Sequence, residues 1–129
     1  MRDGIAALSM IVAAFCMASG ASAQNLENGE TVFKKCRACH MIGPEAANRV
    51  GPSLNGVIGR KAGTVDGFNY SDANKAAGSD GLIWTEEVLF KYLEKPLAFM
   101  PKTKMAFPGL NEEQDRRDII AYLKKFSNR

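Results

Sequence analysis

Hydrophobic residues recur at three- and four-residue spacing in three stretches of the chain, which is the pattern of amphipathic helices. These stretches cover positions 26–35, 85–95 and 111–126. Gly29 lies on the apolar side of the first stretch. A glycine weakens an exposed helix, but on an apolar face it lets a second helix approach closely. We therefore expect a helix crossing at Gly29, with a merely tolerated glycine as the alternative.

End signals accompany the second and third helices. Thr85 suits an N-cap, two glutamates follow it in the first turn, and Pro96 stops the helix. The third helix is expected to start at Asn111, with Gln114 at the capping-box position. Both helices therefore have a predicted start in the sequence itself.

The rest of the chain is mostly loop. Positions 41–67 are rich in Gly, Pro and Asn and have no sustained period, as expected of turns. A short helix is predicted over positions 71–77, capped by Ser71 and followed by Gly78. No convincing strand alternation occurs, so we predict an all-α fold of three main helices, short helices and long loops.

The first 23 residues resemble a secretory leader. A run of apolar and small residues covers positions 5–18, and Ala21-Ser22-Ala23 is the A-x-A pattern after which signal peptidase cuts. We expect a cleaved leader at 1–23, one mature domain at 24–129, and a periplasmic location. Because Asp3 cancels the charge of Arg2, an uncleaved membrane anchor is the alternative. Cys16 follows a bulky residue, which does not suit lipid attachment, and is expected to leave with the leader.

Composition adds one exclusion. The formal net charge is +3, which is too small to indicate nucleic-acid binding by itself. No repeat or low-complexity tract follows the leader.

The most distinctive motif is Cys36-Arg37-Ala38-Cys39-His40, the C-x-x-C-H arrangement of haem c attachment. Two thiols on one helical turn can bond to the two haem vinyl groups, and the imidazole of His40 can then bind the iron. Such links also survive an oxidising compartment. The motif predicts one covalent haem c attached through Cys36 and Cys39, around which the chain wraps.

Three other uses of the motif were weighed. A structural zinc site needs four ligands, but beyond the leader Cys36, Cys39 and His40 are the only Cys and His residues. A thioredoxin-like dithiol would need a βαβ surrounding, which the pattern lacks. A plain disulfide leaves His40 unexplained. Haem attachment accounts for all three residues.

A haem used for electron transfer favours a second axial ligand, and the chain has no second histidine. Met41 adjoins His40 and cannot reach the opposite face. Met100 lies near a helix end, where core packing would also explain it. Met105 lies in a proline-framed loop, 101–109, that can stand over a flat cofactor. Met105 is the favoured ligand and Met100 the alternative.

Together these motifs make the mature chain resemble a class I c-type cytochrome, of the short bacterial kind that is close to mitochondrial cytochrome c. The resemblance covers nearly the whole mature chain. Its motifs are Cys36-Arg37-Ala38-Cys39-His40, Gly51-Pro52-Ser53-Leu54-Asn55-Gly56, Gly59-Arg60-Lys61, Tyr70-Ser71-Asp72-Ala73-Asn74-Lys75, Leu82-Ile83-Trp84, Tyr92-Leu93, Thr103-Lys104-Met105 and Ile120-Ala121-Tyr122-Leu123-Lys124-Lys125.

The resemblance implies roles for individual residues. Met105 would be the distal ligand, and the carbonyl of Pro52 would accept the N–H of His40. A buried haem propionate would be held by Tyr70 and Trp84, with Arg60 nearby. The polar network near the Met105 sulfur would consist of Asn74, Tyr92 and Thr103. The crossing of the first and last helices would be formed by Gly29, Phe33, Ile119 and Tyr122.

Three positions depart from the mitochondrial pattern. The segment between Phe33 and Cys36 is one residue shorter. Asn48 stands where a histidine is usual, which leaves a loop-bridging bond in doubt. Lys102 replaces a glycine in the methionine loop, with an expected effect on loop stiffness or partner charge.

The function expected from this resemblance is one-electron transport by a soluble periplasmic monomer. Its haem iron would cycle between ferric and ferrous states, between a cytochrome bc complex and a terminal oxidase or photosynthetic reaction centre. A haem peroxidase or gas-binding sensor with a labile sixth ligand is the rival, although the chain has no distal histidine.

Lysines from segments expected to border the haem predict a transient docking surface for acidic redox partners. They are Lys34, Lys35, Lys95, Lys102 and Lys104. Acidic residues of the last helix, Glu112, Glu113, Asp115 and Asp118, are expected to lie away from this surface. A generally solvated lysine surface is the alternative.

Overall fold

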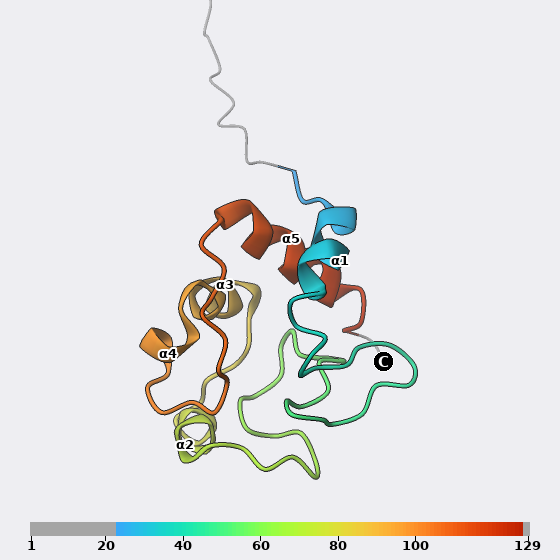
Figure 1. Ribbon diagram of the computed structural model, residues 1–129. Coiled ribbons are helices and arrows are strands. Elements are labelled where there is room, and N and C mark those ends of the chain that lie inside the picture. Colours follow the sequence, from blue (N-terminus) through green and yellow to red (C-terminus); the bar gives the residue numbers. More distant parts are fainter. Residues whose placement is uncertain (1–22, 128–129) are drawn as a thin grey trace, which may run out of the picture.

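The computed structural model describes residues 23–127 and contains five helices (Figure 1). They are α1 (Leu26–Phe33), α2 (Asp72–Ser79), α3 (Glu86–Glu94), α4 (Pro96–Phe99) and α5 (Glu113–Lys124). Within that range there are no strands, only an isolated bridge between Lys61 and Ile83. The all-α prediction is therefore confirmed. Within residues 23–127 no helix has the length and apolarity needed to span a bilayer. The expected leader, apart from Ala23, lies outside the described residues, and so does Cys16.

The crossing of α1 over α5 is the main helix contact of the fold (Figure 1). At Gly29 a Cβ atom would lie 2.2 Å from the carbonyl oxygen of Asp118 in α5. Phe33 packs against Tyr122 with ring centroids 5.7 Å apart, and Ile119 is 1% exposed. The crossing expected at Gly29 is confirmed, and the missing side chain is what permits it.

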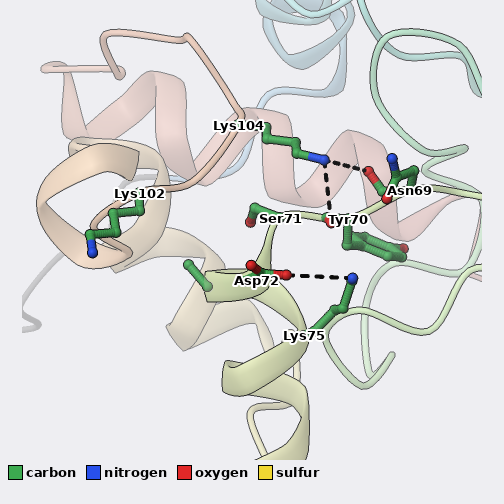
Figure 2. A pocket seen from close by; sticks show the side chains of 8 residues that line it. Asn69, Tyr70, Ser71, Asp72, Lys75, Lys102 and Lys104 are labelled. Carbon is green, nitrogen blue, oxygen red and sulfur yellow. Dashed lines mark hydrogen bonds and ion pairs between the residues drawn. The ribbon is translucent and has the colours of Figure 1, made fainter.

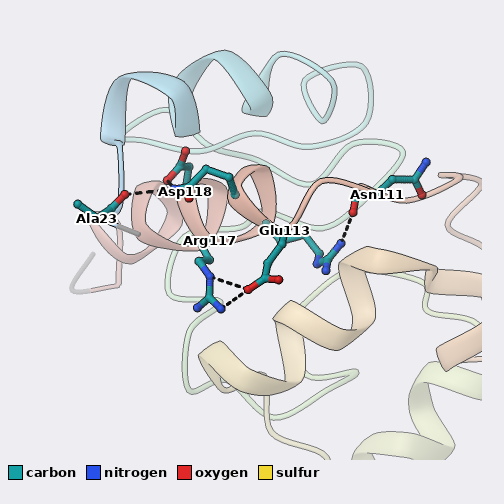
Figure 3. A network of polar contacts seen from close by, with 7 residues as sticks. Ala23, Asn111, Glu113, Arg117 and Asp118 are labelled. Atoms are coloured by element: carbon teal, nitrogen blue, oxygen red, sulfur yellow. Dashed lines mark hydrogen bonds and ion pairs between the residues drawn. The ribbon is translucent and has the colours of Figure 1, made fainter. Parts of the chain in front are cut away.

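The start of α5 differs from the prediction. The N-cap is Glu112, not Asn111, and it makes no side-chain capping bond. Gln114 does not form a capping box. Its Nε2 donates instead to the carbonyl of Ala23 at 3.2 Å and to Oδ1 of Asp118 at 2.8 Å (Figure 3). The amide is therefore used to hold the segment that precedes α1.

Glu112 and Glu113 are exposed, but Asp118, which belongs to the same predicted acidic group, is only 1% exposed. Its carboxylate accepts hydrogen bonds from Asn25 N (2.7 Å), Asn28 Nδ2 (2.8 Å) and Gln114 Nε2 (2.8 Å). Burial alone would raise the pKa of Asp118, but these three bonds stabilise the charged form and lower the pKa below its usual value. The carboxylate thus fastens the start of α1 to α5.

Two predicted helix ends also need correction. Ser71 caps α2, as expected, by accepting a bond from Asn74 N at 3.1 Å. Gly78 lies inside α2 rather than after it, packed against the backbone of Ala62, and Gly81, with φ of 93°, follows the C-cap. Thr85 caps α3 as expected. Pro96 does end α3, but it also begins α4, which the sequence did not predict, because proline suits the first turn of a helix.

Side chains hold the long segment between α1 and α2 in place. Asn48 donates from Nδ2 to the carbonyl of Asp66 at 2.9 Å and accepts from Ser53 N at 3.0 Å. The loop-bridging bond that was in doubt at this position is therefore made by the asparagine. Asn55 bonds to both the N–H and the carbonyl of Gly43, at 2.8 and 2.7 Å. This segment forms the side of the molecule between α1 and α2 (Figure 1).

Candidate haem site

The C-x-x-C-H motif forms a helical turn that directly follows α1. Cys36 N donates to Phe33 O at 2.8 Å, and His40 N donates to Cys36 O at 2.9 Å. Cys36, Cys39 and His40 are all half-buried, and both cysteines are free. The turn thus places two unlinked thiols and an imidazole beside one another, as haem attachment requires.

The orientation of the His40 ring is fixed by contacts with Pro52 and Gly51. Its Nδ1 lies 2.8 Å from the carbonyl oxygen of Pro52, the bond expected from the resemblance. The ring also packs on Gly51, where a Cβ atom would come within 2.3 Å of it. Burial lowers the pKa of His40, against the opposing effect of the Pro52 bond. A neutral ring with Nδ1 already bonded leaves Nε2 as the nitrogen available to a metal ion.

The Cys36 thiol is unsuited to the rival uses of the motif. Burial raises the pKa of Cys36 to about 11. A thiol that stays protonated at neutral pH is neither a good metal ligand nor a good disulfide-exchange nucleophile. Among residues 23–127 no group of three or more His, Cys, Asp or Glu side chains is placed to hold a metal ion. The zinc and redox-dithiol alternatives therefore have no support in the geometry.

The two candidate methionines have different surroundings. Met100 is 5% exposed and belongs to the hydrophobic core. Met105 is only half-buried, and its sulfur accepts a hydrogen bond from the Tyr92 hydroxyl at 3.2 Å. Its backbone N–H donates to the Thr103 hydroxyl at 3.3 Å. The sulfur and the backbone of Met105 are thus both oriented by neighbouring polar groups.

The residues expected at the propionate come together in part. Trp84 N donates to the backbone carbonyl of Arg60 at 2.8 Å, and the Arg60 side chain donates to the carbonyl of Ser53 at 3.0 Å. Tyr70 is close enough to affect the pKa of Arg60, and its hydroxyl accepts a bond from Val65 N at 3.0 Å. These three residues border one part of the interior.

Asn74 is not joined to Tyr92 or Thr103 by any bond in the described part of the chain. Its Oδ1 is buried without a hydrogen-bond partner. An unpaired buried acceptor costs stability, so this atom marks a place where the folded chain lacks a polar neighbour.

The family is settled by comparison with known proteins. The sequence model for "Cytochrome c" matches residues 26–127. Cytochrome c2 of Blastochloris viridis is 53% identical over 107 residues, covering 83% of this chain and 82% of that protein. The chain belongs to the cytochrome c family.

Further comparisons place this cytochrome among the c2-type, class I proteins. Cytochrome c of Gibberella zeae is 46% identical over 101 residues, covering 78% of this chain and 92% of the relative. The solved structure of cytochrome c2 from Rhodospirillum centenum superimposes with a TM-score of 0.76 at 51% identity, covering 80% of this chain and 98% of the other. The family consists of electron carriers, not enzymes, and the chain shares that coarse function.

The cytochrome carries one covalent haem c, attached at Cys36 and Cys39. Two observations on the described residues fit this group: two free thiols, and an imidazole with a single nitrogen left for coordination. Apolar side chains complete the surroundings, since Cys36, Met105 and Phe107 pack against the core.

All five lysines expected at the docking surface are exposed. Lys95 borders a largely apolar hollow together with Met105 and Phe107. Lys102 and Lys104 border a second hollow beside Tyr70 (Figure 2), where Lys104 Nζ donates to the Asn69 and Tyr70 carbonyls at 3.3 and 3.4 Å. Lys102 and Lys104 therefore lie in the loop that contains Met105, and Lys95 borders the same hollow as Met105.

Lys102 has an unusual backbone. Its φ of 67° is the only positive value at a non-glycine residue within positions 23–127. The left-handed region costs a residue with a Cβ atom about 1–2 kcal/mol. Lys102 therefore adopts a backbone conformation that glycine reaches without strain, at the expense of local strain.

Sequence reasoning missed two functional-site candidates on α5, Asp118 and Arg116, which are 1% and 6% exposed. A signal for Asp118 existed, because it precedes Tyr122 by four positions and so shares its buried helix face. Arg116 had no comparable signal, since arginine in the first turns of a helix is usually solvated.

Proposed function

We propose that this cytochrome is a periplasmic carrier of single electrons whose haem has His40 and Met105 as axial ligands. When bound, the haem supplies a one-electron couple between ferric and ferrous iron. The observation that carries the proposal is that hydrogen bonds within the chain orient both candidate ligands, a histidine and a methionine. Pro52 holds the ring of His40, while Tyr92 and Thr103 hold Met105.

The protein's contribution is to keep both ligands in place in both oxidation states. A thioether ligand and apolar surroundings both favour the ferrous state, so they raise the reduction potential. Burial raises the pKa of the Tyr92 hydroxyl, a shift that Thr103 partly offsets, so the phenol stays protonated and continues to donate to the sulfur. Ligands that do not move on electron transfer keep the reorganisation small.

Optical spectra of the purified holoprotein test the ligand assignment. Sharp α and β bands in the reduced protein and the weak long-wavelength band of sulfur-bound ferric haem are expected. Met105→Ala should remove that weak band, and Met100→Ala should retain it. A high-spin, ligand-binding spectrum in the unmutated protein would refute the proposal and favour the peroxidase or sensor alternative.

We further propose that Lys34, Lys35, Lys95, Lys102 and Lys104 steer the carrier to acidic surfaces of a cytochrome bc complex and of an oxidase or reaction centre. Among the described residues none of these five forms an ion pair with a carboxylate, so their charges are available to a partner. Electrostatic steering weakens as salt is added. The contact itself is expected to be small and transient, between a monomer of this chain and its partner.

Stopped-flow electron transfer from a purified cytochrome bc complex tests this docking. We expect the second-order rate to fall as ionic strength rises, and Lys102→Gln to reduce both the rate and its salt dependence. Lys91→Gln removes the same charge from a lysine already paired with Glu87 at 3.0 Å and is the matched control. A salt-independent rate, or equal effects of the two variants, would contradict steering by this surface.

Export is proposed from the A-x-A pattern at Ala21–Ala23. Mass spectrometry of the protein isolated from the periplasm should show a chain that starts at Gln24. A mass that includes the first 23 residues would instead support the membrane-anchor alternative.

A further inference from the structure

Arg116 is a buried cation without an acidic partner. It lies in the second turn of α5 and is 6% exposed. No carboxylate within residues 23–127 forms an ion pair with it, and its Nε is buried without a hydrogen-bond partner. Burying an unpaired charge is costly, so its contacts need an explanation beyond general packing.

Its contacts join three parts of the fold. The Nη1 atom donates to the carbonyl of Leu110 at 2.6 Å. It also donates to the carbonyl of Asn111 at 2.9 Å, the bond drawn in Figure 3. The guanidinium carbon lies 4.5 Å from the ring centroid of Phe90 in α3. A helical side chain points back toward the N-terminus of its helix, which brings the guanidinium to the residues that enter α5. Arg116 therefore ties the chain before α5 to α3.

The two carbonyls that it holds are the exit of the Met105 loop. Leu110 is 4% exposed, and its N–H donates to Leu93 O at 2.8 Å. Gly109, with φ of 113°, lies so close to α3 that a Cβ atom would be 1.9 Å from Glu94 O. Only three residues separate Met105 from this fixed point. A displacement of the exit is thus transmitted to Met105 over a short distance.

The other end of the loop is held separately. Thr103 N donates to Met100 O at 3.1 Å, and Lys104 bonds to the Asn69 and Tyr70 carbonyls. The loop is thus attached at its start, by Thr103 and Lys104, and at its exit, by Leu110 and Asn111. The Met105 sulfur stays in position only while both attachments hold. Arg116 supplies two of the bonds at the exit.

We propose that Arg116 is a positioning residue for Met105, whose bonds to Leu110 and Asn111 keep the methionine loop closed and the sulfur on the iron. This inference rests on the proposed axial ligation by Met105. Loss of the guanidinium should increase the fraction of molecules in which Met105 has left the iron, while attachment at Cys36, Cys39 and His40 stays intact.

Imidazole binding to the ferric holoprotein measures that fraction, because imidazole competes with Met105 for the iron and its apparent affinity scales with the open population. We expect Arg116→Met to bind imidazole roughly tenfold more tightly or better, and Arg116→Lys to lie between it and the wild type. Arg117→Met is the matched control. The guanidinium carbon of Arg117 lies 5.1 Å from the centroid of the Phe90 ring, but its guanidinium pairs with Glu113 on the surface. The affinity of this variant for imidazole should match that of the wild type.

A second variant, Asn28→Ala, distinguishes positioning of Met105 from a general effect on stability. It removes two hydrogen bonds at the α1–α5 crossing, and those bonds involve no residue of the Met105 loop. Imidazole affinity is compared with the free energy of unfolding for each variant. A larger gain in affinity for the Arg116 variants at equal loss of stability supports the proposal. Equal gains overturn it, and if Arg116→Met does not fold, Arg116→Lys decides in the same way. Absence of the sulfur band in the wild type would count against Met105 ligation instead.

Discussion

Replacing Gly29 with alanine should destabilise the protein, although alanine is the better helix former. A Cβ atom at this position would lie 2.2 Å from Asp118 O and 2.8 Å from both Asp118 C and Tyr122 Cβ. Since real Cβ contacts are essentially never under 3.0 Å, the helices must separate locally by about 0.8 Å, the difference between 3.0 and 2.2 Å. The obstacle is backbone, which cannot turn aside as a side chain can.

The expected magnitude follows from two opposing effects. Overpacking of a filled interface costs about 1–3 kcal/mol, and the rigid obstacle favours the upper end. Replacing glycine by alanine within a helix returns about 1 kcal/mol. The net loss should be about 2 kcal/mol, which lowers the melting temperature of a domain of this size by roughly 10 °C.

Guanidinium unfolding of the holoprotein, followed by far-ultraviolet circular dichroism and by haem absorbance, measures this loss. The midpoint should fall while the slope stays constant, because the folded and unfolded surfaces change little. Glu30→Ala, at the exposed neighbouring position of α1, is the control and should stay within about 0.5 kcal/mol of the wild type. A Gly29→Ala protein as stable as that control would refute a close-packed crossing.

Three further predictions concern polar groups. The pKa of Asp118 is lower in the folded protein than in the unfolded chain, so its charged form stabilises the fold at a pH above the unfolded-chain value. This stability is lost as the pH falls below about 4. Asp118→Asn, which turns an amide N–H toward donors such as Asn28, should cost about 2 kcal/mol at pH 7 and flatten the acid limb of a stability–pH curve; an unchanged acid limb would contradict this. Tyr92→Phe removes the donor to the Met105 sulfur and should lower the reduction potential by roughly 20–60 mV, the equivalent of one such hydrogen bond, in spectroelectrochemistry; a rise in potential would oppose the assigned role. Lys102→Gly should stabilise the protein by roughly 0.5–1 kcal/mol in thermal unfolding by relieving the left-handed strain, whereas Lys102→Ala removes the same charge, keeps the strain and should not.

The haem-attachment turn and the helix crossing could be predicted because each depends on local pattern. Cys36, Cys39 and His40 are contiguous, and Gly29 falls on the apolar face of a periodic helix. The choice between Met100 and Met105 is supported by their surroundings, since Met100 is buried in the core and Met105 accepts a bond from Tyr92. Ligation itself stays a prediction for spectroscopy.

What the sequence did not predict depends on contacts between distant residues. Gln114 has the spacing of a capping box, but a bond to Ala23, 91 positions away, uses its amide instead. Asn48 stands where a histidine is usual, yet its amide reaches the carbonyl of Asp66, 18 positions further along the same segment. Pro96 predicts the end of α3, but proline also suits the first turn of a helix, and here it begins α4. In each case a local signal had two physical outcomes, and tertiary contacts selected one.

The closure of α1 on α5 has a consequence for the order in which the protein is made. The hydrogen bond from Asn25 to Asp118 joins residues 93 positions apart, and a chain emerges from the ribosome with its N-terminal end first. Cys36 and Cys39 are therefore synthesised well before the helix that completes the crossing. In the folded chain without haem both thiols are half-buried and the pKa of Cys36 is raised to about 11, so the thiols are less accessible and Cys36 is less reactive than in an open chain. We therefore expect haem to be attached at Cys36 and Cys39 before the crossing of α1 and α5 closes.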